Sequence, residues 1–407
     1  MQLDDIVICD PIRTPIGGFG GLLKSKSAAD LGTIALKALI QRTDLPVSDV
    51  NDVILANCYP SMDAPAIGRV IALNAGLKTG AGGIQIDRRC GSGLQAIIYA
   101  VMQAATGGGD LIIAGGTESM SNAPYYTHEG RWGLAGKSGL MLDDSLAKGR
   151  VSAGGTHHPV PGGMIETAEN LRRDYGISRE AQDAFAKSSQ EKTAAAVKRG
   201  AFDDEITPVT IKTRKDTLTV KHDEHPRPET TLEKLAMLRP IMASSDPDAT
   251  VTAGNASGQN DGAALCIVTT RKKANALGLK TRLQLVSWAI AGVAPSHMGI
   301  GPVPAVKDAL ARADLTLSDI DIIELNEAFA TQVLACTNEL NFSEGDFERL
   351  DINGSGIALG HPVGATGARI FATLAYEMKR RNCQYGLETM CIGGGQGLAA
   401  IFKSASE

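Results

Sequence analysis

An internal repeat constrains the fold of this chain more than any other feature. Residues 35–49 read ALKALIQRTDLPVSD, and residues 305–319, at an offset of 270, read AVKDALARADLTLSD. In both copies the apolar residues keep helical spacing, and a strand-like run follows at residues 53–57 and 322–326. The repeat predicts two halves of similar structure, packed around a pseudo-twofold axis.

The correspondence between the halves continues beyond the repeated helix. Strands that alternate with helices indicate βαβ units and mostly parallel sheets, covered on both faces. We expect a shared site where strand ends and helix starts of both halves converge. Each half has a glycine-rich turn, a helix and a strand that runs into glycines: residues 90–93, 94–105 and 111–116, then residues 360–364, 368–380 and 387–395.

A stretch of different composition separates the two halves. Residues 121–250 are polar and rich in Gly and Pro turns, and they contain two predicted helices, at residues 166–175 and 178–199. Long insertions within compact folds usually carry function. We therefore divide the chain into an N-terminal core half (residues 1–120), this inserted loop domain, and a C-terminal core half (residues 251–407).

The composition excludes several classes of function. The formal net charge is −5 and aromatic residues make up 4% of the chain, so no nucleic-acid-binding surface is expected. The chain has no run of 18 apolar residues, and its N-terminus reads as a strand and not as a signal peptide. Seven cysteines without a secretory signal argue against a disulfide framework. These features predict a cytoplasmic protein that binds neither nucleic acid nor membrane.

Histidine pairs in the insertion invite a metal-site interpretation. His157 and His158 are adjacent, and His222 and His225 flank two acidic residues. Neither pair has a further matched set of ligands, so solvated loops are the better interpretation and no metal site is predicted. The glycines of residues 17–21 likewise match neither the dinucleotide fingerprint nor the phosphate-binding loop.

Cys90 has the surroundings of an activated nucleophile. A strand precedes it, a helix begins at it, and Arg88 and Arg89 are adjacent. A helix N-terminus and nearby cations favour a thiolate, so we expect a lowered pKa for the Cys90 thiol. The alternative is a buried structural cysteine in a tight turn.

Three further residues lie at corresponding strand ends or helix starts. His361 occupies the place in the second half that Cys90 occupies in the first, where it could accept the Cys90 proton or cap a helix. Cys391 follows the last predicted strand and precedes glycines whose N–H groups suit an oxyanion. Asn326 follows the repeated strand, which places it at the same sheet edge.

Together these motifs resemble the four signature blocks of the thiolases. The blocks are residues 90–93 (CGSG), 326–330 (NEAFA), 360–362 (GHP) and 391–395 (CIGGG), in the family's order. Residues 251–258 (VTAGNASG) are similar to a fifth stretch, which contacts coenzyme A in that family. The resemblance runs over nearly the whole chain. It implies the thiolase fold, an α/β protein with a duplicated βαβαβ core in five αβαβα layers and an inserted loop domain that binds coenzyme A.

The resemblance also implies catalytic roles. Cys90 becomes acylated, His361 activates it, and Cys391 is the acid and base at the α-carbon of the substrate. Asn326 holds a water that forms one oxyanion hole with His361. The backbone N–H groups of Cys90 and Gly393 form the other.

Substrate-binding residues follow from the same resemblance. Ser257 and Arg227 match positions that hold the pantetheine and a phosphate of coenzyme A. Met164, Met298 and Phe329 match positions around the acyl and pantetheine pocket. Coenzyme A and acyl-CoA are therefore expected as substrates, with no permanently bound cofactor.

Two positions depart from the family's usual pattern. Asp87 stands where many members have Asn, and residues 163–165 read GMI where the short-chain enzymes usually have HMG. The second departure changes the mouth of the pocket and leaves the preferred acyl-chain length open.

The implied activity is reversible: thiolytic cleavage of a short-chain 3-oxoacyl-CoA, or Claisen condensation of two acyl-CoA molecules, with ping-pong kinetics, in fatty acid metabolism. The sequence leaves the physiological direction open. The resemblance also implies a homo-oligomer, a dimer or a dimer of dimers. Residues 125–137 match the region that joins dimers into tetramers in the family.

Two other interpretations compete with the thiolase hypothesis. A decarboxylating condensing enzyme of the ketoacyl synthase type shares the fold, but it is expected to use two histidines with its cysteine. A non-enzymatic protein that binds acyl-CoA or lipid is expected to lack one of Cys90, His361 and Cys391, and all three are present.

Overall fold

The computed structural model describes residues 3–133, 139–212 and 216–405. Its centre is a ten-stranded sheet in the order β12-β13-β14-β11-β1-β10-β5-β3-β4, with β2 paired to β10. The strands of this sheet are β1 (Ile6–Arg13), β2 (Gly17–Gly18), β3 (Asp52–Ala56), β4 (Ile84–Ile86), β5 (Leu111–Ser119), β10 (Asn260–Thr270), β11 (Thr281–Gly292), β12 (Ile322–Leu325), β13 (Tyr385–Ile392) and β14 (Gln396–Ser404).

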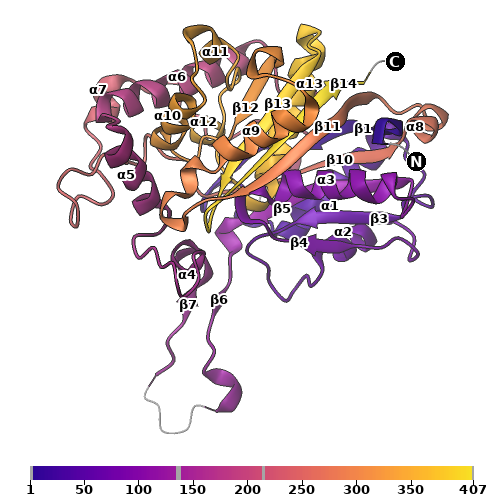
Figure 1. The fold of residues 1–407 in the computed structure, drawn as a ribbon. Helices are drawn as coiled ribbons and strands as arrows, with labels where there is room; N and C mark the ends of the chain where they lie inside the picture. Colours follow the sequence, from indigo (N-terminus) through magenta and orange to yellow (C-terminus); the bar gives the residue numbers. More distant parts are fainter. Residues whose placement is uncertain (1–2, 134–138, 213–215, 406–407) are drawn as a thin grey trace.

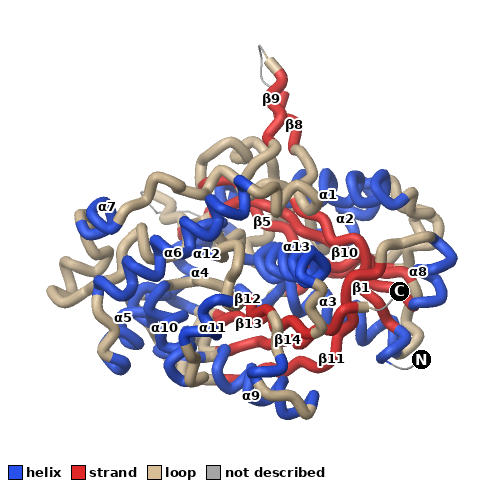
Figure 2. Tube along the Cα trace, turned by 90° about the horizontal axis from the view of Figure 1, so that it is seen from above, coloured by secondary structure: helices blue, strands red, loops and turns tan. Residues whose placement is uncertain are grey.

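The large sheet has two halves, one around β1, β3, β5 and β10 and the other formed by β11 to β14. Helices cover these halves and lie between them (Figure 1, and Figure 2 from above). The helices of the core are α1 (Ala28–Thr43), α2 (Ile67–Ala75), α3 (Ser92–Ala105), α8 (Arg271–Leu277), α9 (Pro302–Ala313), α10 (Ala330–Glu339), α11 (Glu344–Glu348), α12 (Gly356–Leu359) and α13 (Val363–Arg381). Short 3-10 turns are η1 (Leu3–Asp5), η2 (Arg89–Gly91), η3 (Met120–Asn122), η4 (Gly130–Trp132), η5 (Pro295–Ile300) and η6 (Leu317–Asp319).

Three apolar clusters define the layers. Helices α1 and α2 pack on β1, β3, β5 and β10, whereas α9 and α10 pack on β11 to β14. Helices α3 and α13 lie between the two halves of the sheet and contact strands of both. Strand β10 shows the alternation: Cys266 faces the central cluster, and its neighbours Leu265 and Ile267 face the outer one. The five αβαβα layers expected from the sequence are therefore present.

The internal repeat extends to the backbone. Helix α1 ends at Asp44 with φ of 49°, and helix α9 ends at the duplicated position, Asp314, with φ of 54°. Left-handed residues are uncommon outside glycine, so this shared helix end is a specific match between the halves.

The expectation of mostly parallel sheets is wrong. In the described part of the chain, only β3–β4, β3–β5 and β12–β13 pair in parallel, and the other ladders of the large sheet are antiparallel. The cause is visible at β13 and β14, which a turn of residues 393–395 joins. So short a connection permits only an antiparallel hairpin, because a parallel crossover needs a dozen or more residues.

The insertion forms helices around two projecting hairpins. Its elements are α4 (Ser145–Ser152), α5 (Gly163–Tyr175), α6 (Arg179–Lys198), α7 (Leu232–Ala236), and the hairpins β6 (Tyr125–Tyr126) with β7 (Asp143–Asp144) and β8 (Val209–Lys212) with β9 (Thr217–Val220). Both predicted helices are present, and Ser178 caps α6 by accepting a hydrogen bond from the N–H of Ala181. The domain limits at residues 120 and 250 stay a prediction; β10, which follows the insertion, pairs with β1 and β5.

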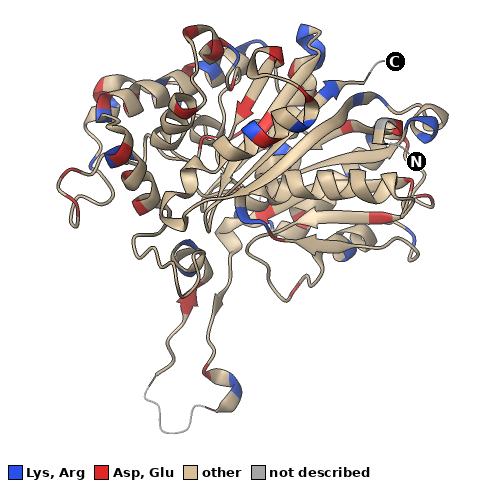
Figure 3. Cartoon of the chain, in the orientation of Figure 1, with Lys and Arg blue, Asp and Glu red and all other residues tan. Residues whose placement is uncertain are grey.

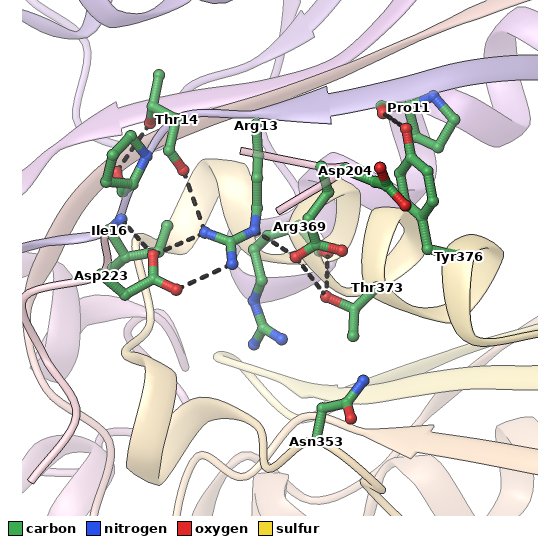
Figure 4. A network of polar contacts seen from close by, with 12 residues as sticks. Pro11, Arg13, Thr14, Ile16, Asp204, Asp223, Asn353, Arg369, Thr373 and Tyr376 are labelled. Atoms are coloured by element: carbon green, nitrogen blue, oxygen red, sulfur yellow. Dashed lines mark hydrogen bonds and ion pairs between the residues drawn. The ribbon is translucent and has the colours of Figure 1, made fainter. Parts of the chain in front are cut away.

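A buried ionic network fastens the insertion to the core (Figure 4). Arg13 of β1 is fully buried and donates to Glu205 at 2.6 Å and to Asp223 at 2.7 and 2.9 Å. Thr373 of α13 donates to the same Glu205 carboxylate at 3.2 Å. Removing one partner would leave an uncompensated buried charge, so the segment that contains Asp223 has a fixed position on the core.

Charged residues of both signs are spread over the outer helices and loops (Figure 3). Over the described ranges, no helix combines the length and the apolar character that a membrane crossing requires. In the same ranges, no group of three or more His, Cys, Asp or Glu side chains could hold a metal ion.

Candidate active site

Cys90 lies within η2, in the sharp turn between β4 and α3. The preceding residue, Arg89, has φ of 46°, which reverses the chain direction just before Cys90. The Ser92 hydroxyl fixes this turn: it accepts from the N–H of Arg88 at 2.6 Å and donates to the carbonyl of Arg89 at 2.7 Å. The thiol is therefore held at the start of α3, where the sequence placed it.

Two glycines allow the N-termini of α3 and α13 to touch. A Cβ on Gly367 would lie 2.3 Å from the backbone of α3, and a Cβ on Gly93 would lie 2.6 Å from the backbone of α13. Val363, at the start of α13, packs in one apolar cluster with Cys90. The contact brings the turn that carries His361 beside the turn that carries Cys90, as the repeat predicts.

His361 is arranged as a neutral proton acceptor. The Thr366 hydroxyl donates to the carbonyl of Pro362 at 2.9 Å, so His361 Nδ1–H must be the donor in its 2.7 Å contact with Thr366. Nε2 then carries the lone pair, is buried, and has no partner among the described residues. Burial, with a smaller effect of Arg369, lowers the pKa of His361 to about 3.

Asn326 and Cys391 lie at the ends of the neighbouring parallel strands β12 and β13. Both are fully buried, and neither polar atom of the Asn326 side chain has a partner in the part of the chain that the structure describes. Burial, reinforced by Cys90, raises the pKa of the Cys391 thiol well above its ordinary value. The backbone N–H of Gly393 acts to lower the pKa of the Cys90 thiol, so this turn lies close to the candidate nucleophile.

The expected lowering of the Cys90 pKa is wrong for this state of the protein. Burial raises the pKa of the thiol, and Arg89 and the N–H groups of Gly393 and Cys90 offset the rise only in part. The Arg88 guanidinium donates to the Gln396 carboxamide at 3.0 Å. We therefore expect a neutral thiol at Cys90 and a neutral imidazole at His361 in the resting state.

This resting state predicts how Cys90 reacts with iodoacetamide. Since its pKa lies above the ordinary value of 9.0, the rate of alkylation should rise with pH throughout the neutral range and level off only beyond that value. The measurement is mass spectrometry of the Cys90 peptide at a series of pH values. A rate already constant from pH 6 upward would show that a thiolate–imidazolium pair forms instead.

Three further predicted residues surround Cys391. Met298 and Phe329 pack with it in one apolar cluster, and Met164 lies against that cluster. The Met164 side chain also reaches the Gly393 turn, because a Cβ on Gly393 would lie 3.3 Å from its terminal methyl. The structure thus brings together the residues expected to line an acyl and pantetheine pocket.

Residues of the insertion and of the C-terminal half line a separate cavity of about 490 Å³, and Arg227, His225 and Gly254 are among them. The Arg227 guanidinium donates to three carbonyls of its own loop, at residues 224–226, so its position is fixed. Ser257 does not line this cavity; its N–H donates to the carbonyl of Ala328 at 2.9 Å, beside the apolar cluster around Cys391.

Sequence reasoning missed two supports of the site. Glu118, at the end of β5, is fully buried and accepts from the N–H groups of Cys58, Tyr59 and Gly364 at 2.9, 3.2 and 2.9 Å. Burial raises its pKa to about 7. A lone acidic residue within an apolar strand could have signalled it. Thr366 lies five residues after His361, in the first turn of α13, and no sequence signal marked it.

Comparison with known proteins identifies the family of the chain. The family model "Thiolase, N-terminal domain" matches residues 6–272, and "Thiolase, C-terminal domain" matches residues 279–404. The acetyl-CoA acetyltransferase of Thiocystis violacea is 45% identical and covers 97% of this chain and 98% of its own. Beta-ketothiolase BktB of Cupriavidus necator is 44% identical, covering 98% and 99%. The crystal structure of the Bacillus anthracis acetyl-CoA acetyltransferase superposes with a TM-score of 0.92 at 40% identity, covering 98% and 99%.

Proposed function

The chain belongs to the thiolase family, and from this premise we propose that it is an acyltransferase that interconverts a short-chain 3-oxoacyl-CoA plus coenzyme A with two acyl-CoA molecules. One observation carries the proposal. The turns of Cys90, His361 and Cys391 converge, with an unprotonated Nε2 at His361 and a buried thiol at Cys391.

In the cleavage direction, His361 Nε2 takes the proton of Cys90, and the sulfur attacks the 3-oxo carbon. The bond between C2 and C3 then breaks, which leaves an acyl group on Cys90 and an enolate of acetyl-CoA. Cys391 gives its proton to C2, and acetyl-CoA departs. A new coenzyme A thiol passes its proton to Cys391 and attacks the acyl group, after which His361 returns its proton to Cys90.

Negative charge develops on a substrate oxygen at two of these reaction steps. The N–H groups of Cys90 and Gly393 both act to lower the pKa of the Cys90 thiol, and N–H groups so placed suit the oxygen of an acyl group bound there. Asn326 and His361 have buried polar atoms without partners among the described residues, which suits the thioester oxygen of the enolate.

The site supports this chemistry over both alternatives. A decarboxylating condensing enzyme is expected to place a second histidine where this chain has Cys391. A protein that only binds acyl-CoA needs neither a fixed imidazole tautomer nor a second buried thiol beside the nucleophile.

The direct test is thiolysis of acetoacetyl-CoA by the purified protein in the presence of coenzyme A, followed by a series of 3-oxoacyl-CoA substrates of rising chain length. We expect two acetyl-CoA molecules per acetoacetyl-CoA, and a fall in kcat/KM at a chain length that the pocket no longer accepts. No coenzyme A-dependent cleavage of any member of the series would refute the proposal.

Arg227 is proposed to bind a phosphate of coenzyme A without a role in the chemistry. It is exposed at the rim of the 490 Å³ cavity, so its loss should weaken binding by about 1 kcal/mol. Arg227→Ala is expected to raise the KM for coenzyme A several-fold with little change in kcat. Arg239→Ala, an exposed arginine outside the cavity lining, is the matched control. A large loss of kcat at saturating substrate would contradict this assignment.

We also propose a homo-oligomer, a dimer or a dimer of dimers, that works in cytoplasmic fatty acid metabolism. The β6–β7 hairpin projects far from the body (Figure 1), and its side chains Tyr125, Trp132 and Met141 are 64%, 89% and 81% exposed. Apolar side chains so exposed support a subunit contact there. Residues 134–137 of the predicted contact region lie outside the described residues.

The oligomer is tested by light scattering on the wild type and on Trp132→Ser. We expect a mass of at least two chains for the wild type, and a smaller assembly for the variant if the hairpin joins dimers. A wild-type protein that is active as a stable monomer would contradict the proposal.

A further inference from the structure

Asn260, the first residue of β10, connects three separate segments through its side chain. It is fully buried, and its Oδ1 accepts from the backbone N–H of His361 at 2.9 Å. Its Nδ2 donates to the carbonyl of Gly17 at 2.9 Å and lies 3.1 Å from His225 Nδ1. Because His361 N–H can only donate, the orientation of the amide is fixed, and His225 Nδ1 must be the acceptor.

His225 holds the same segment at a second point. Its other ring nitrogen carries the proton, and the backbone of Ile357 in α12, three residues before Gly360, acts to raise the pKa of the ring; both residues line one cavity. Asn260 therefore contacts the turn at His361, where the turn ends, and His225 lies against it at Ile357, near where it begins.

The turn that ends in His361 is closely packed against both side chains. Gly360 has φ of 92°, and a Cβ there would lie 2.6 Å from the Asn260 carboxamide. A Cβ on Gly258 would lie 2.4 Å from the His225 ring. Two glycines thus permit the close approach of Asn260 and His225 to the chain that carries the base.

His225 also lines the 490 Å³ cavity at which Arg227 is proposed to bind coenzyme A, here called the coenzyme A cavity. His225, Arg227 and Ile357 all line the 490 Å³ cavity. The loop of His225 is itself fixed, because Asp223 pairs with Arg13 and Glu224 accepts from the N–H of Gly18 at 2.8 Å. A continuous set of contacts therefore runs from the cavity wall to the backbone of His361.

We propose that Asn260 and His225 are positioning residues that hold His361 in line with Cys90 and join the catalytic base to the coenzyme A cavity. Neither touches the reacting atoms; Asn260 acts through the backbone N–H of His361, and His225 acts through Asn260 and Ile357. The inference rests on the proposed function, because it takes His361 as the base.

The test compares Asn260→Ala with a pair of His225 variants in thiolysis of acetoacetyl-CoA. Asn260→Ala releases the backbone of His361, and a misplacement of about 1 Å costs on the order of 100-fold in kcat. The KM for coenzyme A should change less than about threefold, because Asn260 is not among the residues that line the cavity. The rate of single-turnover acylation of Cys90 should fall with kcat.

The His225 pair keeps the test valid if Asn260→Ala fails to fold. His225→Asn retains an acceptor where Nδ1 stands, and it should keep kcat within about threefold of the wild type. His225→Phe removes that acceptor, and kcat should fall about tenfold, with a higher KM for coenzyme A. Rescue by the conservative variant separates positioning from a general loss of stability.

Asn51→Ala is the matched control for removing a structural amide. Asn51 accepts from the N–H groups of Asp110 and Leu111 at 2.8 and 3.0 Å, in a turn away from the site, so kcat should stay within about twofold. An active wild type with Asn260→Ala and His225→Phe both at wild-type kcat would overturn this inference alone. An inactive wild type would overturn the proposed function.

Discussion

Replacing Cys90 by serine is expected to lower kcat for thiolysis by roughly 10⁴-fold or more, because the acyl carrier is lost. A serine hydroxyl is far less acidic than a thiol, and neutral His361 cannot deprotonate it to a useful extent. The fold should persist, since serine differs from cysteine by one atom and Cys90 lies at the rim of its apolar cluster.

The measurement is mass spectrometry after incubation with acetyl-CoA, together with initial-rate kinetics. The wild type should carry one acetyl group on Cys90 and give the parallel-line pattern of a ping-pong mechanism. Cys383→Ser, at a partly exposed cysteine remote from the motifs, should retain both properties. Acetyl recovered on a residue other than Cys90 would refute its role.

The internal repeat in the sequence predicts which turns form the site. Cys90 and His361 occupy equivalent turns, and equivalent turns in two packed halves must meet near their common axis. The glycines of those turns are visible in the sequence, and they are what permits α3 and α13 to touch.

Other features could not be predicted because they depend on long-range burial and contact. Nearby arginines suggested a lowered pKa for Cys90, but the burial that outweighs them exists only in the fold. Asn260 reaches His361 across 101 residues, and His225 reaches Asn260 across 35. No local pattern marks such pairs. The expectation of parallel sheets failed for a related reason: β10 and β14, the strands that follow the βαβ units, run antiparallel to their neighbours.

Cys391→Ala is expected to separate the two halves of the reaction. Claisen condensation needs one thiol to carry the acyl group and a second group to move a proton at the α-carbon of another acyl-CoA. Cys391 is fully buried, and burial keeps its pKa well above the ordinary value, so it rests as a thiol ready to protonate the enolate formed in cleavage. Its replacement should therefore leave acylation of Cys90 by acetyl-CoA intact in a single turnover.

The same variant should lose cleavage of acetoacetyl-CoA and the exchange of α-protons of acetyl-CoA for deuterium, each by roughly 100-fold or more. Cys266→Ala is the matched control, because Cys266 is equally buried but belongs to the central apolar cluster. Exchange is measured by mass spectrometry of recovered acetyl-CoA. A variant that still cleaves and exchanges at the wild-type rate would show that another group moves this proton. The thiolase mechanism would then not apply to this chain.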